Sequence, residues 1–401
     1  MRRAYLLLLL GACSSGQSSR SSDSGPDTYR RPESETRRPS TDRGLRAGEV
    51  DDNDKFDDYV RYFKAYPDRN VRKIDVTDRM VLWFADRENR PVSCSPVRIL
   101  ADGQEVYRAV TSAGGGLMFP PRALGVSSQV QLFEADIVGR KVAFRPGDHV
   151  QVSVDIAQAQ WDSVDLDVAF CLDTTGSMGD EIDRLTSTLR SVVSRIDRLQ
   201  PQPRLRLGMI TFKDRRDSYI TERTDLTANL DKFQWELSRT TASGGGDYEE
   251  SVNEGLRRAI HDLSWRRNQA IRILFLIGDA PPHMDYSDDT PYTETMRVAL
   301  ERGIKIYTIA ASGLNDKGEF VWRQLAQFTL AKFMFISYGG GTGHHVGSYR
   351  ENNLDELMVK AIEGEVASLR LGRERRSSSS EGQGKEPTDF RQWREWRDRD
   401  R

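Results

Sequence analysis

The chain has little of what several functional classes require. Its 401 residues include three cysteines and five histidines, too few for a disulfide-stabilised scaffold or a four-cysteine zinc site. Lysine and arginine number 59 against 61 aspartate and glutamate residues, which gives a formal net charge of −2. Nucleic-acid-binding domains usually carry a clear basic excess, so we expect no nucleic-acid partner.

Apolar residues are also scarce. They make up 37% of the chain and the mean hydropathy is −0.62, whereas a typical globular domain is about 45–50% apolar. The deficit is concentrated in a serine-rich stretch at residues 13–50 and a charged stretch at residues 370–401. Such segments bury too little apolar surface to offset the entropy lost on ordering. We therefore predict a disordered tether (13–50) and a disordered tail (370–401).

The first residues have the layout of a secretory signal. Arg2 and Arg3 precede a leucine run at residues 6–10, and small residues lead to Cys13. The run is far shorter than the ~20 residues that span a bilayer. Leu10-Gly11-Ala12-Cys13 resembles the lipobox of bacterial lipoproteins. The resemblance implies a signal peptide at residues 1–12, lipidation of Cys13 and a membrane anchor in the cell envelope, with Ser14 favouring the outer membrane. An ordinary signal peptide is the alternative.

Residues 51–157 predict a small all-β module with a short leading helix. Phe56, Tyr59, Val60 and Phe63 have helical spacing, and we expect this helix to pack on the module that follows. From residue 73 onward, short β-branched and aromatic runs alternate with turn signals such as Asp102-Gly103. Short strands at this spacing predict a sandwich. The order of its turns loosely resembles immunoglobulin-like modules of secreted proteins.

Residues 158–369 alternate strand and helix patterns. The segments 164–172 and 271–277 are nearly continuous apolar runs, as expected for parallel strands that are buried on both faces. A helical pattern follows the first run at 182–196, and a last helix is expected at 353–367. This alternation predicts an α/β fold with a doubly wound, mostly parallel sheet. Ligands of such sheets bind beyond the carboxyl ends of the strands.

Oxygen-bearing side chains follow two of these strands. Asp173, Thr175 and Ser177 lie at alternate positions in the turn after the first strand, and Asp279 follows the strand at 271–277. Carboxylate and hydroxyl oxygens are hard ligands that suit Mg²⁺ or Mn²⁺. Because the ends of parallel strands meet at one edge of a sheet, the sequence predicts a cation site there.

This pattern resembles the von Willebrand factor A (vWA) domain and its metal-ion-dependent adhesion site. The likeness runs over about residues 163–366 and implies that Asp173, Thr175, Ser177 and Asp279 are metal ligands. It also implies a bound Mg²⁺ or Mn²⁺, with Ca²⁺ as a further option, whose shell is completed by an acidic side chain of a protein partner. In that family a threonine on a second loop is also a metal ligand. The corresponding loop here, residues 241–250, has no threonine beside the start of the following helix. Asp247 and Glu250 are both candidates for that position.

The sequence therefore predicts a membrane-anchored lipoprotein whose vWA domain mediates metal-dependent protein binding or adhesion. One alternative is a structural envelope scaffold in which the cation only stabilises loops. A metal-assisted hydrolase is another, with His283 close to Asp279 in the chain. We predict no enzyme, because the sequence shows no Ser-His-Asp order, Cys-His pair or His-Glu-x-x-His helix. Whether Cys94 and Cys171 form a disulfide stays open.

Overall fold

The computed structural model describes residues 45–146, 151–155, 163–200, 202–267, 269–337, 344, 346 and 349–369. The predicted signal peptide, Cys13, most of the predicted tether and the tail at 370–401 lie outside the described residues. Within the described ranges, no helix combines the length and apolarity needed to cross a bilayer.

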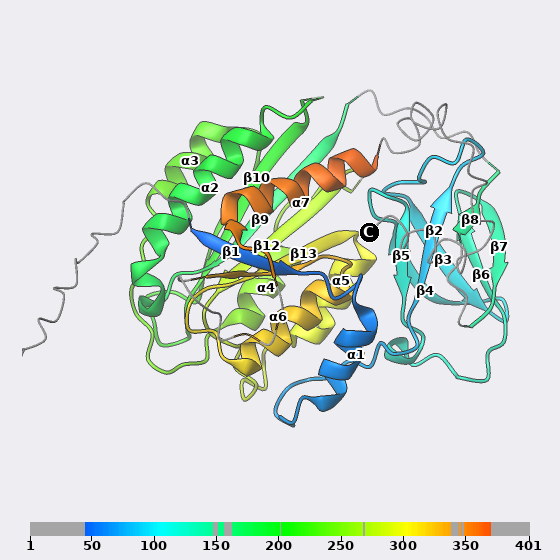
Figure 1. The fold of residues 1–401 in the computed structure, drawn as a ribbon, viewed down its shortest axis with the longest axis horizontal. Coiled ribbons are helices and arrows are strands. Elements are labelled where there is room, and N and C mark those ends of the chain that lie inside the picture. Colours follow the sequence, from blue (N-terminus) through cyan, green and yellow to red (C-terminus); the bar gives the residue numbers. More distant parts are fainter. Residues whose placement is uncertain are drawn as a thin grey trace, which may run out of the picture. The chain divides into compact units, whose positions relative to one another are not determined.

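One sheet forms the centre of the α/β part (Figure 1), and in the described part of the chain it has eight strands in the order β11-β10-β9-β12-β13-β14-β1-β15. Its parallel strands are β9 (Asp165–Asp173), β10 (Arg204–Phe212), β12 (Ile271–Gly278), β13 (Ile304–Ala310) and β14 (Phe333–Ile336). The antiparallel strands are β11 (Thr221–Thr227), β1 (Arg46–Val50) and β15 (Asn352–Asn353). Since β9 lies between β10 and β12, the strand order reverses at its carboxyl end, where such sheets bind ligands.

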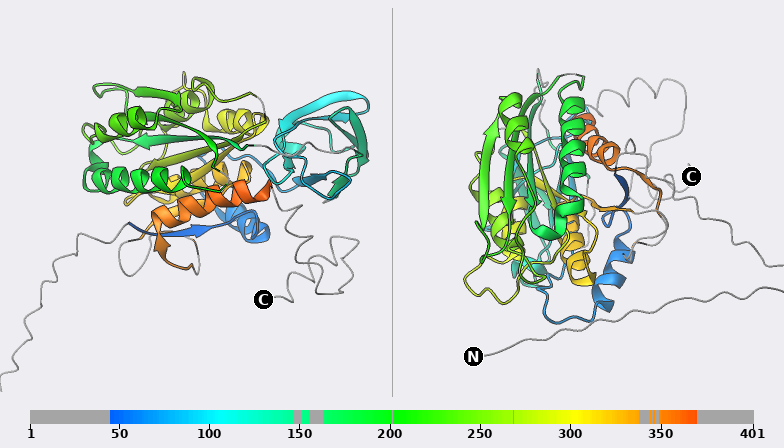
Figure 2. Two further views of the ribbon diagram at one scale, coloured as in Figure 1. Left: turned by 90° about the horizontal axis from the view of Figure 1, so that it is seen from above. Right: turned by 90° about the vertical axis from the view of Figure 1, so that its left-hand side faces the viewer.

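Helices cover both faces of this sheet (Figures 1 and 2). One face packs against α2 (Ile182–Ile196), α3 (Leu230–Ser238) and α7 (Leu354–Ser368), and the other against α4 (Val252–His261), α5 (Tyr292–Glu301) and α6 (Asp316–Phe328). Along β9, Phe170 and Leu172 belong to the core on the side of α2, α3 and α7. Ala169 and Cys171 belong to the core on the side of α4, α5 and α6. Burial on both faces explains the unbroken apolar run, and the predicted doubly wound α/β fold is confirmed.

The β module consists of two packed sheets. The first contains β2 (Met80–Ala85), β5 (Gly116–Phe119) and β8 (Gln151–Ser153), and the second β3 (Pro96–Ala101), β4 (Gln104–Val110), β6 (Phe133–Ile137) and β7 (Arg140–Phe144). A short 3-10 turn, Arg122–Leu124, lies between β5 and β6. Phe119 from the first sheet meets Phe133 from the second edge to face, with ring centroids 5.0 Å apart. The predicted sandwich is therefore present.

Regular structure begins closer to the amino terminus than predicted. Residues 46–50, inside the predicted tether, form β1, which pairs antiparallel with β14 and places Ala47 opposite Ile336. The predicted helix is α1 (Phe56–Ala65), but its end packs on the α/β part as well, because Tyr66 stacks on Phe320 of α6 at 4.3 Å. The α/β sheet thus includes a strand from the amino-terminal side of the β module.

A buried ion pair fixes this segment to α6. Arg323 donates from Nε and Nη2 to the two carboxylate oxygens of Asp52, at 2.9 and 2.6 Å, and from Nη1 to Glu319 at 3.1 Å. All three side chains are buried. Burial raises the pKa of the Asp52 carboxyl, while its bonds to Arg323 act in the opposite direction. Buried charges of this kind depend on their partners.

Cys94 and Cys171 are both buried free thiols. The disulfide that the sequence left open is therefore not formed in this structure.

Candidate metal centre

The first loop of the site follows β9 directly. Asp173, the last residue of the strand, is fully buried. Its Oδ1 accepts hydrogen bonds from the backbone N–H of Thr175 at 2.9 Å and from Thr175 Oγ1 at 2.7 Å. An aspartate that binds the backbone two residues ahead stabilises a tight turn, and this turn holds the carboxylate at the carboxyl end of β9.

Gly176 brings the first and second loops together. Its N–H donates to the carbonyl of Gly244 at 3.0 Å, and a Cβ at position 176 would lie 2.5 Å from the same oxygen. No side chain fits at that distance. The glycine is therefore required here for close approach of two backbones.

The third loop completes a hydrogen-bonded chain of predicted residues. Ser177 Oγ donates to Asp279 Oδ1 at 3.1 Å and lies 3.1 Å from Thr175 Oγ1. Asp279 follows β12 and is buried. The structure thus brings the side chains of Asp173, Thr175, Ser177 and Asp279 together, while their role as metal ligands stays a prediction.

The second loop separates its two candidate ligands. Glu250 is 2% exposed, and a Cβ placed on Gly245 would lie 3.6 Å from both Glu250 Oε1 and Thr175 Cβ. Glu250 therefore reaches the first loop. The side chain of Asp247 is 59% exposed, and its Oδ2 lies 3.9 Å from His283 Nε2 instead. This geometry favours Glu250 over Asp247 beside Asp173, although its role as a ligand stays a prediction.

Backbone contacts hold Glu250 in this position. Its N–H donates to the carbonyl of Pro281 at 3.1 Å, and the N–H of His283 donates to the carbonyl of Glu250 at 3.2 Å. The second loop is therefore tied to the third loop immediately after Asp279.

These carboxyl groups are buried close together, so their charged forms are disfavoured in the absence of a cation. Burial and then the neighbouring Asp279 raise the pKa of Asp173, against the opposing effect of its hydrogen bonds from Thr175, to about 7. Burial and then Asp173 raise the pKa of Glu250 to about 9, and burial raises the pKa of Asp279. Asp173 Oδ2 and Glu250 Oε2 are buried without a hydrogen-bond partner among the described residues. Unpaired buried oxygens are costly, and a cation would satisfy them.

Residues 167–333 match the family model of the von Willebrand factor A domain. The chain contains a vWA domain. The curated relative "Putative ariadne-like RING finger protein R811" of Acanthamoeba polyphaga mimivirus is 32% identical over 118 residues, which cover 29% of this chain and 11% of that protein. The chain thus spans about a tenth of the length of that relative. The crystal structure of the conserved hypothetical protein BatB from Bacteroides thetaiotaomicron aligns with a TM-score of 0.35 and 15% identity, over 51% of this chain and 99% of that one.

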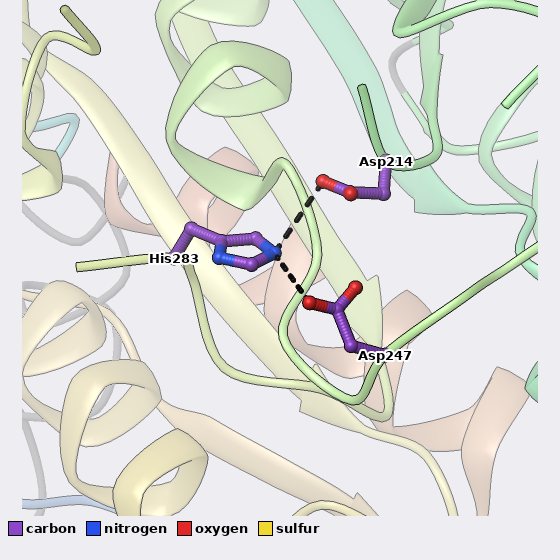
Figure 3. Close-up of side chains that lie close together, drawn as sticks. All are labelled: Asp214, Asp247 and His283. Atoms are coloured by element: carbon purple, nitrogen blue, oxygen red, sulfur yellow. Dashed lines mark ion pairs between the residues drawn. The ribbon is translucent and has the colours of Figure 1, made fainter. Parts of the chain in front are cut away.

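A second cluster in the vWA domain was not predicted from the sequence. Asp214 follows β10, and His283 follows β12; both side chains are buried. His283 Nε2 lies 3.5 Å from Asp214 Oδ1 and 3.9 Å from Asp247 Oδ2 (Figure 3). The available signal was an aspartate just beyond a parallel strand, as at Asp173.

Proposed function

We propose that the vWA domain binds Mg²⁺ or Mn²⁺ through Asp173, Thr175, Ser177 and Asp279, with Glu250 from the second loop, and that this site binds a protein partner. One observation carries the proposal: hydrogen bonds link the first four side chains, while Asp173 Oδ2 and Glu250 Oε2 remain buried without partners in the described structure. vWA domains are generally protein-interaction modules, which supports the proposal that this site binds a protein partner.

The residues at this site have different roles. Asp173 and Asp279 would supply charge from two adjacent strands, and Thr175 and Ser177 would supply neutral oxygens. When bound, the cation would present positive charge to an acidic side chain of the partner. Glu250 brings a third carboxylate near the site. Because more ligand charge strengthens cation binding, Glu250 also reduces how strongly the site needs an acidic ligand from the partner.

An exposed aromatic residue lies at the rim of the site. The side chain of Tyr248 remains partly exposed, while its hydroxyl donates to the carbonyls of Asp279 and Gly313 at 3.2 and 2.7 Å and accepts from the N–H of Asn315 at 2.9 Å. Tyrosine is enriched at protein interfaces. A fixed, exposed tyrosine beside the predicted cation therefore supports a partner surface here.

Metal-dependent capture tests the proposal. Immobilised full-length protein is incubated with envelope extract in Mg²⁺ or in chelator, and calorimetry of the same protein measures Mg²⁺ binding. We expect one saturable site and a captured partner that is lost in chelator. Capture that is the same with and without the cation would contradict the proposal. Cation binding that raises the melting temperature without any metal-dependent capture would favour the structural scaffold.

We also propose that Cys13 anchors the protein to a membrane of the cell envelope, the outer membrane where two are present. The support is the lipobox-like sequence alone. Each CH₂ of a lipid chain buried in a bilayer contributes about 0.8 kcal/mol, so loss of the acyl chains has a large effect. Expressed in a bacterial host, Cys13→Ala is expected to move the protein out of the membrane fraction, whereas Ser15→Ala leaves it there. An unchanged distribution of Cys13→Ala would contradict the anchor.

A further inference from the structure

We propose a second cation site in the vWA domain, in which Asp214, Asp247 and His283 bind a transition-metal ion of the Zn²⁺ class. The three side chains converge on one point (Figure 3). One possible ligand atom from each residue lies within 4.8 Å of the other two. A mixed imidazole and carboxylate set favours transition metals over Mg²⁺, so this site differs in chemistry from the all-oxygen site at Asp173.

The strongest observation is the imidazole of His283. The residue is 4% exposed, yet Nε2 has no hydrogen-bond partner in the described part of the chain. Nε2 points between the carboxylates of Asp214 and Asp247. A buried ring nitrogen without a hydrogen bond is unfavourable, and coordination of a metal would satisfy it.

The spacing of the ligand atoms suits a small tetrahedral ion. His283 Nε2 lies 3.5 Å from Asp214 Oδ1 and 3.9 Å from Asp247 Oδ2. A tetrahedral Zn²⁺ with bonds of about 2.0–2.2 Å separates its ligand atoms by roughly 3.3–3.6 Å. Of these two distances, the one to Asp247 is the longer, and Asp247 is the exposed member of the three, whose ligand atoms all lie within 4.8 Å of one another. A small movement of that side chain would close the site.

Neighbouring groups orient both buried ligands. His283 Nδ1 lies 2.8 Å from Asp285 Oδ1, and the ring of Tyr286 stacks on the imidazole at 3.9 Å. With Nδ1–H donating to Asp285, Nε2 carries the lone pair that a metal needs. Metal-binding histidines commonly use such a carboxylate contact.

The carboxylate of Asp214 is held in the same way. Tyr286 donates from its hydroxyl to Asp214 Oδ2 at 2.9 Å, and Ser251 Oγ donates to Asp214 Oδ1 at 3.0 Å. Ser251 is the chain neighbour of Glu250, so adjacent residues of the second loop face the two sites. The second site is thus close to the first but has its own ligands.

The site is accessible from solvent through a cavity of about 460 Å³ whose lining includes Asp247, His283 and Asp285. The cavity provides a route for the ion and room for a fourth ligand, such as water. A protonated His283 that forms ion pairs with the aspartates would give a similar arrangement without metal. Titration with metal separates the two explanations.

The test uses full-length protein carrying Asp173→Asn, which disables the first site, so the result does not depend on the function proposed above. Calorimetry with Zn²⁺ alone is expected to show one site. Adding His283→Ala should weaken Zn²⁺ binding at least about a hundredfold, and Asp285→Ala about 10–100-fold. His261→Ala and Asp288→Ala are matched controls, because exposed His261 lies on α4 and Asp288 pairs with Arg215. Neither control should change the affinity.

Co²⁺ absorption provides a second readout. A nitrogen-containing, four-coordinate Co²⁺ site absorbs strongly in the visible range, and this band should disappear with His283→Ala. Should that variant fail to fold by circular dichroism, His283→Gln replaces it. Absence of Zn²⁺ binding to the folded Asp173→Asn protein, or equal binding with and without His283, would overturn the inference. Neither result bears on Mg²⁺ binding by the wild type, which tests the first site separately.

Discussion

Replacing Asp173 with Asn is expected to lower the affinity for Mg²⁺ at least about a hundredfold, because ligand charge sets cation affinity, without destabilising the metal-free protein. Asn keeps the size of the side chain and an Oδ1 that can accept both hydrogen bonds from Thr175. It removes a carboxyl group whose charged form is disfavoured by burial and by Asp279 and which itself raises the pKa of Glu250. Loss of the ligand and relief of repulsion therefore have opposite consequences with and without the cation.

Calorimetry and thermal melts in Mg²⁺ or chelator measure both effects. Asp180→Asn is the matched control, since Asp180 is an exposed carboxylate of the 3-10 turn that follows Asp173. The control should keep both Mg²⁺ affinity and the metal-induced rise in melting temperature. If Asp173 only stabilised the turn, Asp173→Asn would lower the melting temperature by the same amount in Mg²⁺ and in chelator. That outcome would exclude a metal role for Asp173.

The same variant should change how stability depends on pH. Without a cation, the folded protein keeps a proton on Asp173 up to a pKa of about 7, whereas an unfolded aspartate loses it near 3.9. Between these values the folded state binds more protons, so this group makes the free energy of unfolding fall as pH rises. From pH 5 to 8 in chelator, the melting temperature of the wild type should fall more than that of Asp173→Asn. Parallel profiles would contradict the raised pKa.

Replacing Asp52 with Ala is expected to reduce the free energy of unfolding by about 3–5 kcal/mol, the usual cost of removing one partner of a buried ion pair. The substitution leaves the Arg323 guanidinium buried with Glu319 as its remaining carboxylate in this group. It also removes two hydrogen bonds that join the segment after β1 to α6. Urea unfolding measures the change.

An exposed ion pair provides the comparison. Asp58 pairs with Arg61 on the surface of α1, and exposed pairs contribute only about 0–1 kcal/mol. Asp58→Ala should therefore be nearly neutral. If Asp52→Ala were equally mild, the buried pair would not be what holds this segment in place.

The parts of the fold that could be predicted from the sequence are those with a local signal. β9 and β12 are apolar throughout because both faces are covered, and Asp173 and Asp279 follow directly from where these strands end. β11 was missed because Thr221–Thr227 is a mostly polar sequence at the sheet edge. β1 was missed because five residues with little apolar character form a strand only by pairing with β14, far away in the chain.

The candidate site was predictable to a similar degree. In the second loop, three glycines at 244–246 precede Asp247 and Glu250 and interrupt any regular strand or helix spacing. Spacing alone therefore could not decide which of the two is the ligand. Backbone bonds from Glu250 and His283 to the neighbouring loop determine the arrangement. Asp214 and His283 lie on different loops, and only the order of the parallel strands brings them together.

The position of β1 also determines how tension would pass through the molecule. The whole β module lies between β1 and β9 in the chain, so a pull on the residues before β1 reaches the central sheet without first loading the sandwich. The force would act on the hydrogen bonds from β1 to β14 and β15 and then on the pair between Asp52 and Arg323. If the amino-terminal side of the chain is held, the domain that carries the predicted partner site resists the force directly, and the sandwich remains unstretched.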